Sequence, residues 1–425
     1  MNLKSVALKD DGIISEGLKP PANPKNRPGA LDHGPGAYQP RSMRVITTTV
    51  ELRTLAEELA GRQFVAVDTE FMRETTYWPK LCLVQAAAPG VEAVIDPLSP
   101  GLDLGPLLSL MGDKDVLKVF HAARQDLEIF NKLAGALPAS VFDTQIAAMA
   151  CGYGDSIAYD ALVQQVLKRR LDKSSRFTDW ARRPLSEPQL AYALADVTHL
   201  RDLYPRLHHK LESANRLAWL DEEHANLLDP DVYDTTPENA WQRLKLRKTT
   251  PDYVLALQIA AAWRERQAQA RDVPRGRVVK DDALYEIAEH RPKSAGDFDR
   301  MRAVPRGFGN SRGAQDLLRA LDRAFADPKR KIYQHERGPT APSGLGPTVE
   351  LLKVLLRLEA EANEVAPRLI ASAADIEAIA ADDNAEVRAL SGWRREVFGE
   401  RALALKHGKI ALKLKDGQVA LEDLH

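Results

Sequence analysis

The stretch Phe64-Val-Ala-Val-Asp68-Thr-Glu70 has the pattern of a short apolar strand that ends in two carboxylates. Side chains two residues apart on a strand lie on the same face, so Asp68 and Glu70 point the same way. An Asp-x-Glu pair at a strand end is most often part of a solvated turn, and its spacing alone is weak evidence for a site. The segments on either side decide whether other carboxylates join this pair.

Apolar segments on either side predict a mixed sheet covered by helices. The expected strands are short apolar runs bounded by turn residues, at 43–49, 64–67, 81–85, 91–95 and 116–120. Helices are expected after a capping-box pattern at Thr48 and Glu51, and from apolar spacing near 143–150, 159–168 and 187–213. Three strands in a meander followed by helix-strand-helix units favour an α/β domain.

Three further residues are candidates for the same site. Asp126 falls one turn into a helix that begins where the 116–120 strand ends. Tyr192 and Asp196 lie four residues apart, on one face of the 187–213 helix. Each has a simpler interpretation, because an Asp early in a helix favours the helix dipole and a helical Tyr commonly packs in the core. If the elements meet at one edge of the sheet, four carboxylates converge beside Tyr192.

Four converging carboxylates imply bound cations. Unpaired carboxylates about 4 Å apart repel each other by roughly 1 to 4 kcal/mol, depending on the dielectric constant. Such a cluster is tenable mainly with divalent cations, and oxygen ligands alone suit Mg²⁺ or Mn²⁺. Two such ions about 3.5–4 Å apart can activate a water molecule and stabilise the leaving oxygen in phosphodiester hydrolysis.

The composition is that of a soluble globular protein with several domains. The 425 residues include 59 Lys and Arg against 60 Asp and Glu, and 44% are hydrophobic. This balance excludes a uniformly basic nucleic-acid coat, and no apolar run approaches the ~18 residues of a membrane span. The two cysteines lack a metal-binding spacing, and charged residues interrupt the N-terminus where a signal peptide would be apolar. We therefore expect a cytoplasmic protein without a membrane association.

The chain is expected to divide into five segments. Residues 1–42 are rich in Pro and Gly without an apolar period, which predicts either a disordered extension or an over-extended reading frame. The α/β domain is assigned to 43–230, a small helical domain to 231–330, a linker to 331–347 and a second helical domain to 348–425. The first helical domain is locally basic, with 20 Lys and Arg against 12 Asp and Glu in its last 90 residues, a balance of +8.

The two helical domains share a weak internal repeat. Four apolar positions of the first recur in the second at an offset of 92 residues, with Val278, Leu284, Ile287 and Ala288 matching Ile370, Ile376, Ile379 and Ala380. Four matches between amphipathic helices are easily obtained by chance. A diverged internal duplication is therefore only an expectation.

Three stretches resemble, in family order, the exonuclease motifs of ribonuclease D, at 67–85, 118–130 and 179–197. The resemblance implies a ribonuclease H-like 3′→5′ exonuclease of the DEDD superfamily, in its tyrosine variant. It also implies that two divalent metal ions, Mg²⁺ or Mn²⁺, are bound by Asp68, Glu70, Asp126 and Asp196. It also implies that Tyr192 orients the attacking water.

The first helical domain resembles the helicase-and-RNase-D C-terminal (HRDC) module over 263–284. A divergent second copy would account for 348–425. The local balance of +8 suits contacts to a phosphate backbone, and a solvated basic surface is the simpler alternative.

The resemblance implies a metal-dependent exoribonuclease that trims 3′ ends of structured RNA precursors, tRNA above all, and releases nucleoside 5′-monophosphates. RNA is the expected partner, no obligate protein partner is expected, and the oligomeric state is left open. Two alternatives remain: the same chemistry on DNA, and a non-catalytic RNA-binding scaffold with an exonuclease fold. Intact residues at all five active-site positions argue against the scaffold.

Other polar residues lie beside these motifs. Four of them precede the 187–213 helix and either contact substrate or support their loop: Lys173, Arg176, Asp179 and Trp180. His121 and Asp143 are expected to hold strand and helix ends together, outside the metal site.

Overall fold

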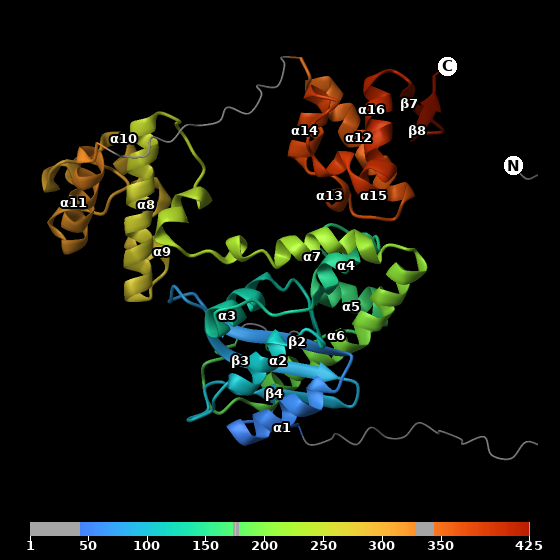
Figure 1. Cartoon of the computed structure of the whole chain (residues 1–425), viewed down its shortest axis with the longest axis horizontal. Helices are drawn as coiled ribbons and strands as arrows, with labels where there is room; N and C mark the ends of the chain where they lie inside the picture. Colours follow the sequence, from blue (N-terminus) through green and yellow to red (C-terminus); the bar gives the residue numbers. More distant parts are fainter. Residues whose placement is uncertain (1–42, 173–174, 176–177, 329–343, 425) are drawn as a thin grey trace, which may run out of the picture. The chain divides into compact units, whose positions relative to one another are not determined.

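The structure is a computed structural model that describes residues 43–172, 175, 178–328 and 344–424 (Figure 1). The disorder expected for 1–42, most of the linker expected at 331–347, and the two residues Lys173 and Arg176 lie outside this range.

A mixed sheet of six strands forms the centre of the first domain. Its strands are β1 (Val45–Ile46), β2 (Phe64–Met72), β3 (Lys80–Ala88), β4 (Val91–Ile95), β5 (Leu117–Phe120) and β6 (Val141–Asp143), in the order β1-β4-β3-β2-β5-β6. The meander β2-β3-β4 is antiparallel, whereas β1, β5 and β6 each pair in parallel with a neighbour. The α/β prediction with a mixed sheet is therefore confirmed.

Helices cover both faces of this sheet (Figure 1). One face packs with α1 (Thr49–Ala60), α2 (Gly105–Gly112) and α3 (Arg124–Ala134), and the other packs with α4 (Thr144–Ala150), α5 (Tyr159–Leu167) and α6 (Glu187–Ser213). The predicted capping box forms at Thr48 with Glu51, and a second forms at Ser186 with Gln189. The second box starts the long helix α6, which carries two of the candidate site residues.

A series of short helices leads from α6 to the first helical domain. They are η1 (Leu217–Leu220), α7 (Asp221–Leu227), η2 (Pro230–Tyr233) and η3 (Pro237–Arg243). The domain itself contains α8 (Pro251–Arg271), α9 (Arg275–Val278), α10 (Asp281–His290) and α11 (Arg312–Ala326), with short 3-10 turns between the last two. Its core is built on α8, where Val254, Leu257 and Ala261 pack against α10 and α11.

Two helices of the C-terminal domain follow their counterparts in the first helical domain at the predicted offset. It contains α12 (Gly346–Ala362), α13 (Pro367–Ile370), α14 (Ala373–Ala381), α15 (Gly392–Arg394) and α16 (Glu400–Lys406). The short helices α9 and α13 start at 275 and 367, and α10 and α14 start at 281 and 373, so both pairs are 92 residues apart. The domain also ends in a hairpin, β7 (Ile410–Lys415) and β8 (Gln418–Asp423), which the all-helical expectation did not include.

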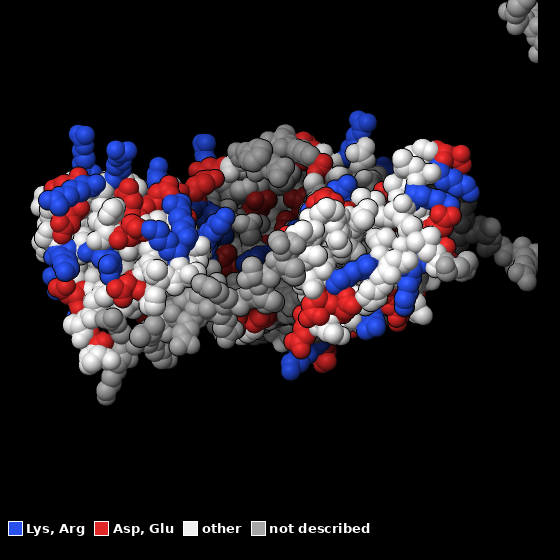
Figure 2. Space-filling view, turned by 90° about the horizontal axis from the view of Figure 1, so that it is seen from above, with Lys and Arg blue, Asp and Glu red and all other residues white. Residues whose placement is uncertain are grey.

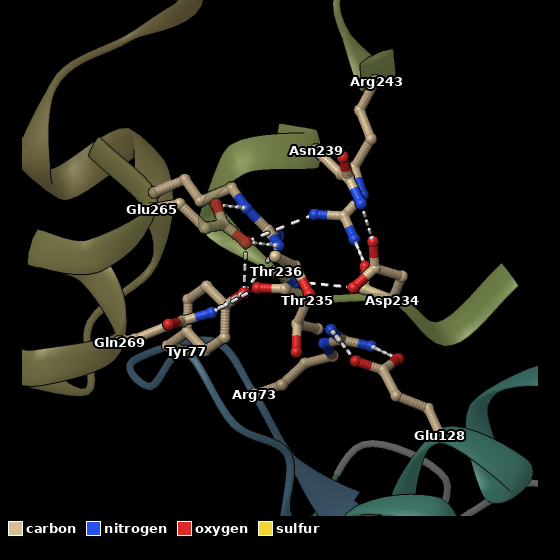
Figure 3. Close-up of polar contacts among 11 residues, drawn as sticks. Arg73, Tyr77, Glu128, Asp234, Thr235, Thr236, Asn239, Arg243, Glu265 and Gln269 are labelled. Carbon is tan, nitrogen blue, oxygen red and sulfur yellow. Dashed lines mark hydrogen bonds and ion pairs between the residues drawn. The ribbon is translucent and has the colours of Figure 1, made fainter. Parts of the chain in front are cut away.

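The loop between β2 and β3 is held by the first helical domain (Figure 3). The hydroxyl of Tyr77 donates to the buried carboxylate of Glu265 and accepts from Gln269 and Arg275, at 3.1 and 2.9 Å. The carboxylate of Asp272 accepts the N–H groups of Tyr77 and its neighbour Trp78 at 3.0 and 3.1 Å. Burial would raise the pKa of Glu265, but hydrogen bonds from Arg275 and Tyr77 outweigh it and hold that pKa below its usual value.

Among the described helices, none has the combination of length and apolarity that crossing a bilayer requires.

Candidate active site

Strand β2 brings the first two carboxylates to the face of the sheet that α6 covers. Its alternation places Phe64 and Ala66 in the core shared with α6, and Asp68 and Glu70 continue the same face toward the strand end. A register shift in the pairing with β3 follows Glu70, and such bulges turn side chains locally. The two carboxylates therefore leave the apolar core where the sheet opens into a pocket.

The pocket has a volume of about 460 Å³ and gathers residues from β2, α5 and α6. Four of the five candidate residues line it: Asp68, Glu70, Tyr192 and Asp196. Carboxylate oxygens of Asp68, Glu70 and Asp196 lie within 4.8 Å of one another. Three of the four predicted ligands thus meet at a spacing that one ion can bridge.

Asp126, the fourth predicted ligand, lies beside this group without belonging to it. It sits in the first turn of α3, only 6% exposed, and its Oδ1 accepts a hydrogen bond from the hydroxyl of Thr69 at 2.5 Å. Thr69 lies between Asp68 and Glu70 in the chain, so this bond ties α3 to the carboxylate-bearing end of β2.

Burial and mutual repulsion shift the titration of these carboxyls. Burial raises the pKa of Asp68 to about 7. Burial, together with the charges of Asp68, Asp196 and Asp126, raises the pKa of Glu70 to about 9, and that of Asp126 is also raised well above its usual value by burial and by Asp68. A set of crowded, desolvated oxygen donors has the chemistry of a divalent-cation site, and the residues present fit such an ion.

Tyr192 and Asp196 follow each other by one turn of α6. The ring of Tyr192 packs near Trp180, with centroids 6.0 Å apart, and Trp180 is buried. Trp180 therefore supports the site wall, whereas Asp179 accepts the N–H of Ala181 at 3.0 Å and shapes the loop.

Tyr159 is a pocket residue that the sequence reasoning missed. Its hydroxyl donates to the main-chain carbonyl of Asp196, and burial raises its pKa well above the usual value. Its helix was predicted, but the spacing of one Tyr in an amphipathic helix carries no signal of a pocket. Gln145, Asp160 and Asp172 line the same pocket and were also not singled out.

His121 and Asp143 hold element ends together. Nδ1 of His121 lies 3.0 Å from the hydroxyl of Thr144. Asp143 caps α4 by accepting the N–H of Gln145 at 2.7 Å. His121 also lines the pocket, where burial lowers its pKa.

Comparisons with known proteins show which families this chain matches. A family described as a 3′-5′ exonuclease matches residues 43–212, and the HRDC domain family matches residues 256–321. Ribonuclease D of Nitrobacter hamburgensis is 51% identical over 87% of this chain and 97% of its own, and that of a Jannaschia species is 47% identical over 89% and 99%.

A solved structure extends the likeness to three dimensions. The crystal structure of Escherichia coli RNase D, described as an exoribonuclease involved in structured RNA processing, has a TM-score of 0.74 at 29% identity, covering 87% of this chain and 99% of its own. From the similarity of fold, length and domain order to these relatives, it follows that the chain belongs to the ribonuclease D family of exoribonucleases.

Proposed function

We propose that this exoribonuclease trims the 3′ ends of structured RNA precursors, tRNA precursors above all, and releases nucleoside 5′-monophosphates. The observation that carries the proposal is the cluster of Asp68, Glu70 and Asp196, whose carboxylate oxygens lie within 4.8 Å of one another in a pocket that Tyr192 also lines. The choice of substrate is supported by the E. coli relative, which is described as involved in structured RNA processing.

The proposed ligands of two divalent ions, Mg²⁺ or Mn²⁺, are Asp68, Glu70, Asp126 and Asp196. When bound, such ions supply charge that stabilises the phosphorane-like transition state and the leaving oxygen. The residues themselves provide an oxygen-only donor set, desolvated enough to raise the pKa of Asp68 to about 7 and of Glu70 to about 9 without a cation.

The proposed role of Tyr192 is to orient the water that attacks the terminal phosphodiester. Its position one turn before Asp196 on α6 places its ring on the same wall of the pocket, and contact with Trp180 limits its rotation. Water is the nucleophile in this scheme, so no covalent intermediate with the enzyme forms.

The first helical domain is proposed to contact the phosphate backbone. Lys and Arg side chains stand out at the left of Figure 2, where this domain lies, interspersed with acidic ones. Several of its basic residues are engaged in ion pairs, such as Arg247 with Asp282 and Lys248 with Glu289. Exposed basic residues outside those ion pairs include Arg277, Arg302 and Arg306, which suit RNA phosphates.

Digestion of a 3′-labelled, 3′-extended tRNA and of a DNA of matched sequence tests this function. We expect nucleoside 5′-monophosphates from the RNA in the presence of Mg²⁺ or Mn²⁺ and none in EDTA. Preference for the DNA would establish the alternative of a DNA exonuclease. No hydrolysis of either nucleic acid, with tight RNA binding, would establish the scaffold alternative.

A further inference from the structure

The start of α3, the helix that carries Asp126, is anchored by Asp143 of β6. The carboxylate of Asp143 accepts the N–H of Ala122 at 3.0 Å on one oxygen and that of Ala123 at 2.8 Å on the other. Ala122 has a φ of 57°, a left-handed conformation that is unfavourable for a residue with a Cβ atom. Ala123, the N-cap residue, makes no side-chain capping bond, so these two bonds to Asp143 fix where the helix begins.

Asp143 is held in turn by His224 of α7. The main-chain N–H of Asp143 donates to Nε2 of His224 at 3.0 Å, and the imidazole packs against Phe142 with ring centroids 5.5 Å apart. Burial lowers the pKa of His224, although Asp143, Asp221 and Glu223 oppose this shift. The neutral ring leaves Nε2 free to accept this bond.

The C-terminal domain holds α7 in place through a buried arginine. The side chain of Arg394 is only 3% exposed and donates to Glu222 and, at 2.9 Å, to Glu223. Its Nε donates to the carbonyl of Leu369 at 2.8 Å. A buried guanidinium with all these partners fixes the two glutamates directly before His224.

A stacked pair of tryptophans supports the same contact. The rings of Trp219, in η1, and Trp393, in α15, lie 4.0 Å apart with an interplanar angle of 4°. Ala366 of the C-terminal domain also donates its N–H to the carbonyl of Met149, at the end of α4, at 2.9 Å. The C-terminal domain therefore contacts both elements, α4 and α7, that flank Asp143.

We propose that Asp143 and His224 are positioning residues for Asp126, and that the C-terminal domain completes their arrangement through Arg394. Arg394 contacts Glu223, which precedes His224 in the chain. His224 accepts the main-chain N–H of Asp143, and Asp143 in turn accepts two N–H groups at the start of α3. This inference rests on the proposed assignment of Asp126 as a metal ligand. It gives the C-terminal domain a role in the metal site that requires no contact with RNA.

Two substitutions of His224 in the full-length protein separate positioning from general stability. His224→Leu removes the acceptor, whereas His224→Gln keeps a side-chain oxygen close to the position of Nε2. We expect His224→Leu to raise the Kd for Mn²⁺ and to lower kcat, each about tenfold with KM unchanged, and His224→Gln to restore most of both, because residues that orient ligands have effects of this size. Calorimetric titration with Mn²⁺ alone measures the first effect without RNA or turnover.

His209→Ala is the matched control, since His209 lies exposed on α6 and we expect no change in Kd or kcat. If His224→Leu does not fold, Asp143→Asn serves in its place, because it keeps the size of the side chain and removes one of its two acceptor oxygens. Arg394→Met is expected to weaken Mn²⁺ binding in the same direction, and less than additively when combined with His224→Leu.

The outcomes distinguish this inference from the function on which it rests. The positioning role would be overturned if His224→Leu leaves Mn²⁺ affinity unchanged, or if His224→Leu and His224→Gln weaken it equally. This holds even if Asp126→Asn abolishes Mn²⁺ binding. Undiminished Mn²⁺ binding in Asp126→Asn would instead overturn the proposed ligand set.

Discussion

The hydroxyl of Tyr77 donates a hydrogen bond to the carboxylate of Glu265, a residue 188 positions later in the chain. Tyr77 belongs to the loop that joins β2, with its two site carboxylates, to β3, and Glu265 belongs to α8 (Figure 3). Arg275 also donates to both oxygens of this carboxylate at 2.6 Å, and Arg243 donates to one at 3.2 Å. The charge on Glu265 is therefore fully engaged although the side chain is 1% exposed.

Tyr77→Phe is expected to lower the free energy of unfolding by about 1.5–3 kcal/mol, because it removes a hydrogen bond to a buried charged group. Urea denaturation followed by circular dichroism measures this loss. Tyr253→Phe is the matched control, since the Tyr253 hydroxyl is buried and has no hydrogen-bond partner within the described residues. Equal losses in the two variants would show that the bond to Glu265 contributes nothing specific.

Without metal ions, the protein is expected to become less stable as the pH rises. The pKa values of Asp68 and Glu70 are raised to about 7 and about 9 in the folded chain, against about 4 in an unfolded one. At pH values between the unfolded and the folded pKa of each group, the folded state binds more protons than the unfolded state. The free energy of unfolding therefore falls with pH until about pH 9.

Thermal unfolding in EDTA between pH 5 and pH 9 tests this dependence. Glu70→Gln is expected to flatten the decline, because the amide cannot ionise, and Mg²⁺ is expected to stabilise the wild type most at the alkaline end. Parallel pH curves for the wild type and Glu70→Gln would contradict the shift assigned to Glu70.

Tyr192→Phe and Asp196→Asn are both expected to lower the rate of RNA hydrolysis, for different reasons. Loss of the Tyr192 hydroxyl should lower kcat by about 10²-fold and leave Mn²⁺ affinity intact, in line with the size of effects from groups that orient or deprotonate a reactant. Asp196→Asn should weaken Mn²⁺ binding as well as turnover. Single-turnover hydrolysis and calorimetric Mn²⁺ titration of both variants make the comparison, and weakened metal binding in Tyr192→Phe would argue for a ligand role instead.

A double charge reversal in the first helical domain is expected to affect binding more than chemistry. Arg302→Glu with Arg306→Glu should raise KM for a structured RNA, leave kcat unchanged, and reduce the slope of log Kd against log salt by about 2, one for each phosphate that is no longer neutralised. The control reverses Arg53 and Arg62, two exposed residues in and just after α1. The same weakening in the control would mean that net charge, not this surface, determines binding.

The long helix α6 and the meander could be predicted because their signals are local. Ser186 with Gln189 is a capping box in sequence and in space, and the helix runs over 187–213 as expected. Strand β6 was missed, because three residues carry no period and its burial depends on pairing with β5. Asp68 and Glu70 could be placed on one face from strand alternation, but their convergence with Asp196 depends on how α6 crosses the sheet.

The contacts of Tyr77 with Glu265 and of Arg394 with Glu223 could not be predicted from the sequence. Each joins residues more than 150 positions apart, at 188 and 171, so no periodicity or spacing links the partners. Both carboxylates belong to helices whose charged residues have the pattern of ordinary solvated faces. Only tertiary packing buries Glu265 and Arg394, and a buried charge needs a partner, so each of the two is paired with other residues.

The recurrence of helices at an offset of 92 residues has a consequence for how substitutions in the two halves should be interpreted. The two helical domains contact the exonuclease domain through different residues. The C-terminal domain does so through Trp393 and Arg394, so substitutions there are expected to weaken the contact between these two domains. Exposed arginines of the first helical domain, such as Arg302, are expected to tolerate replacement without unfolding the protein, so variation there is expected to change nucleic-acid binding without changing the fold.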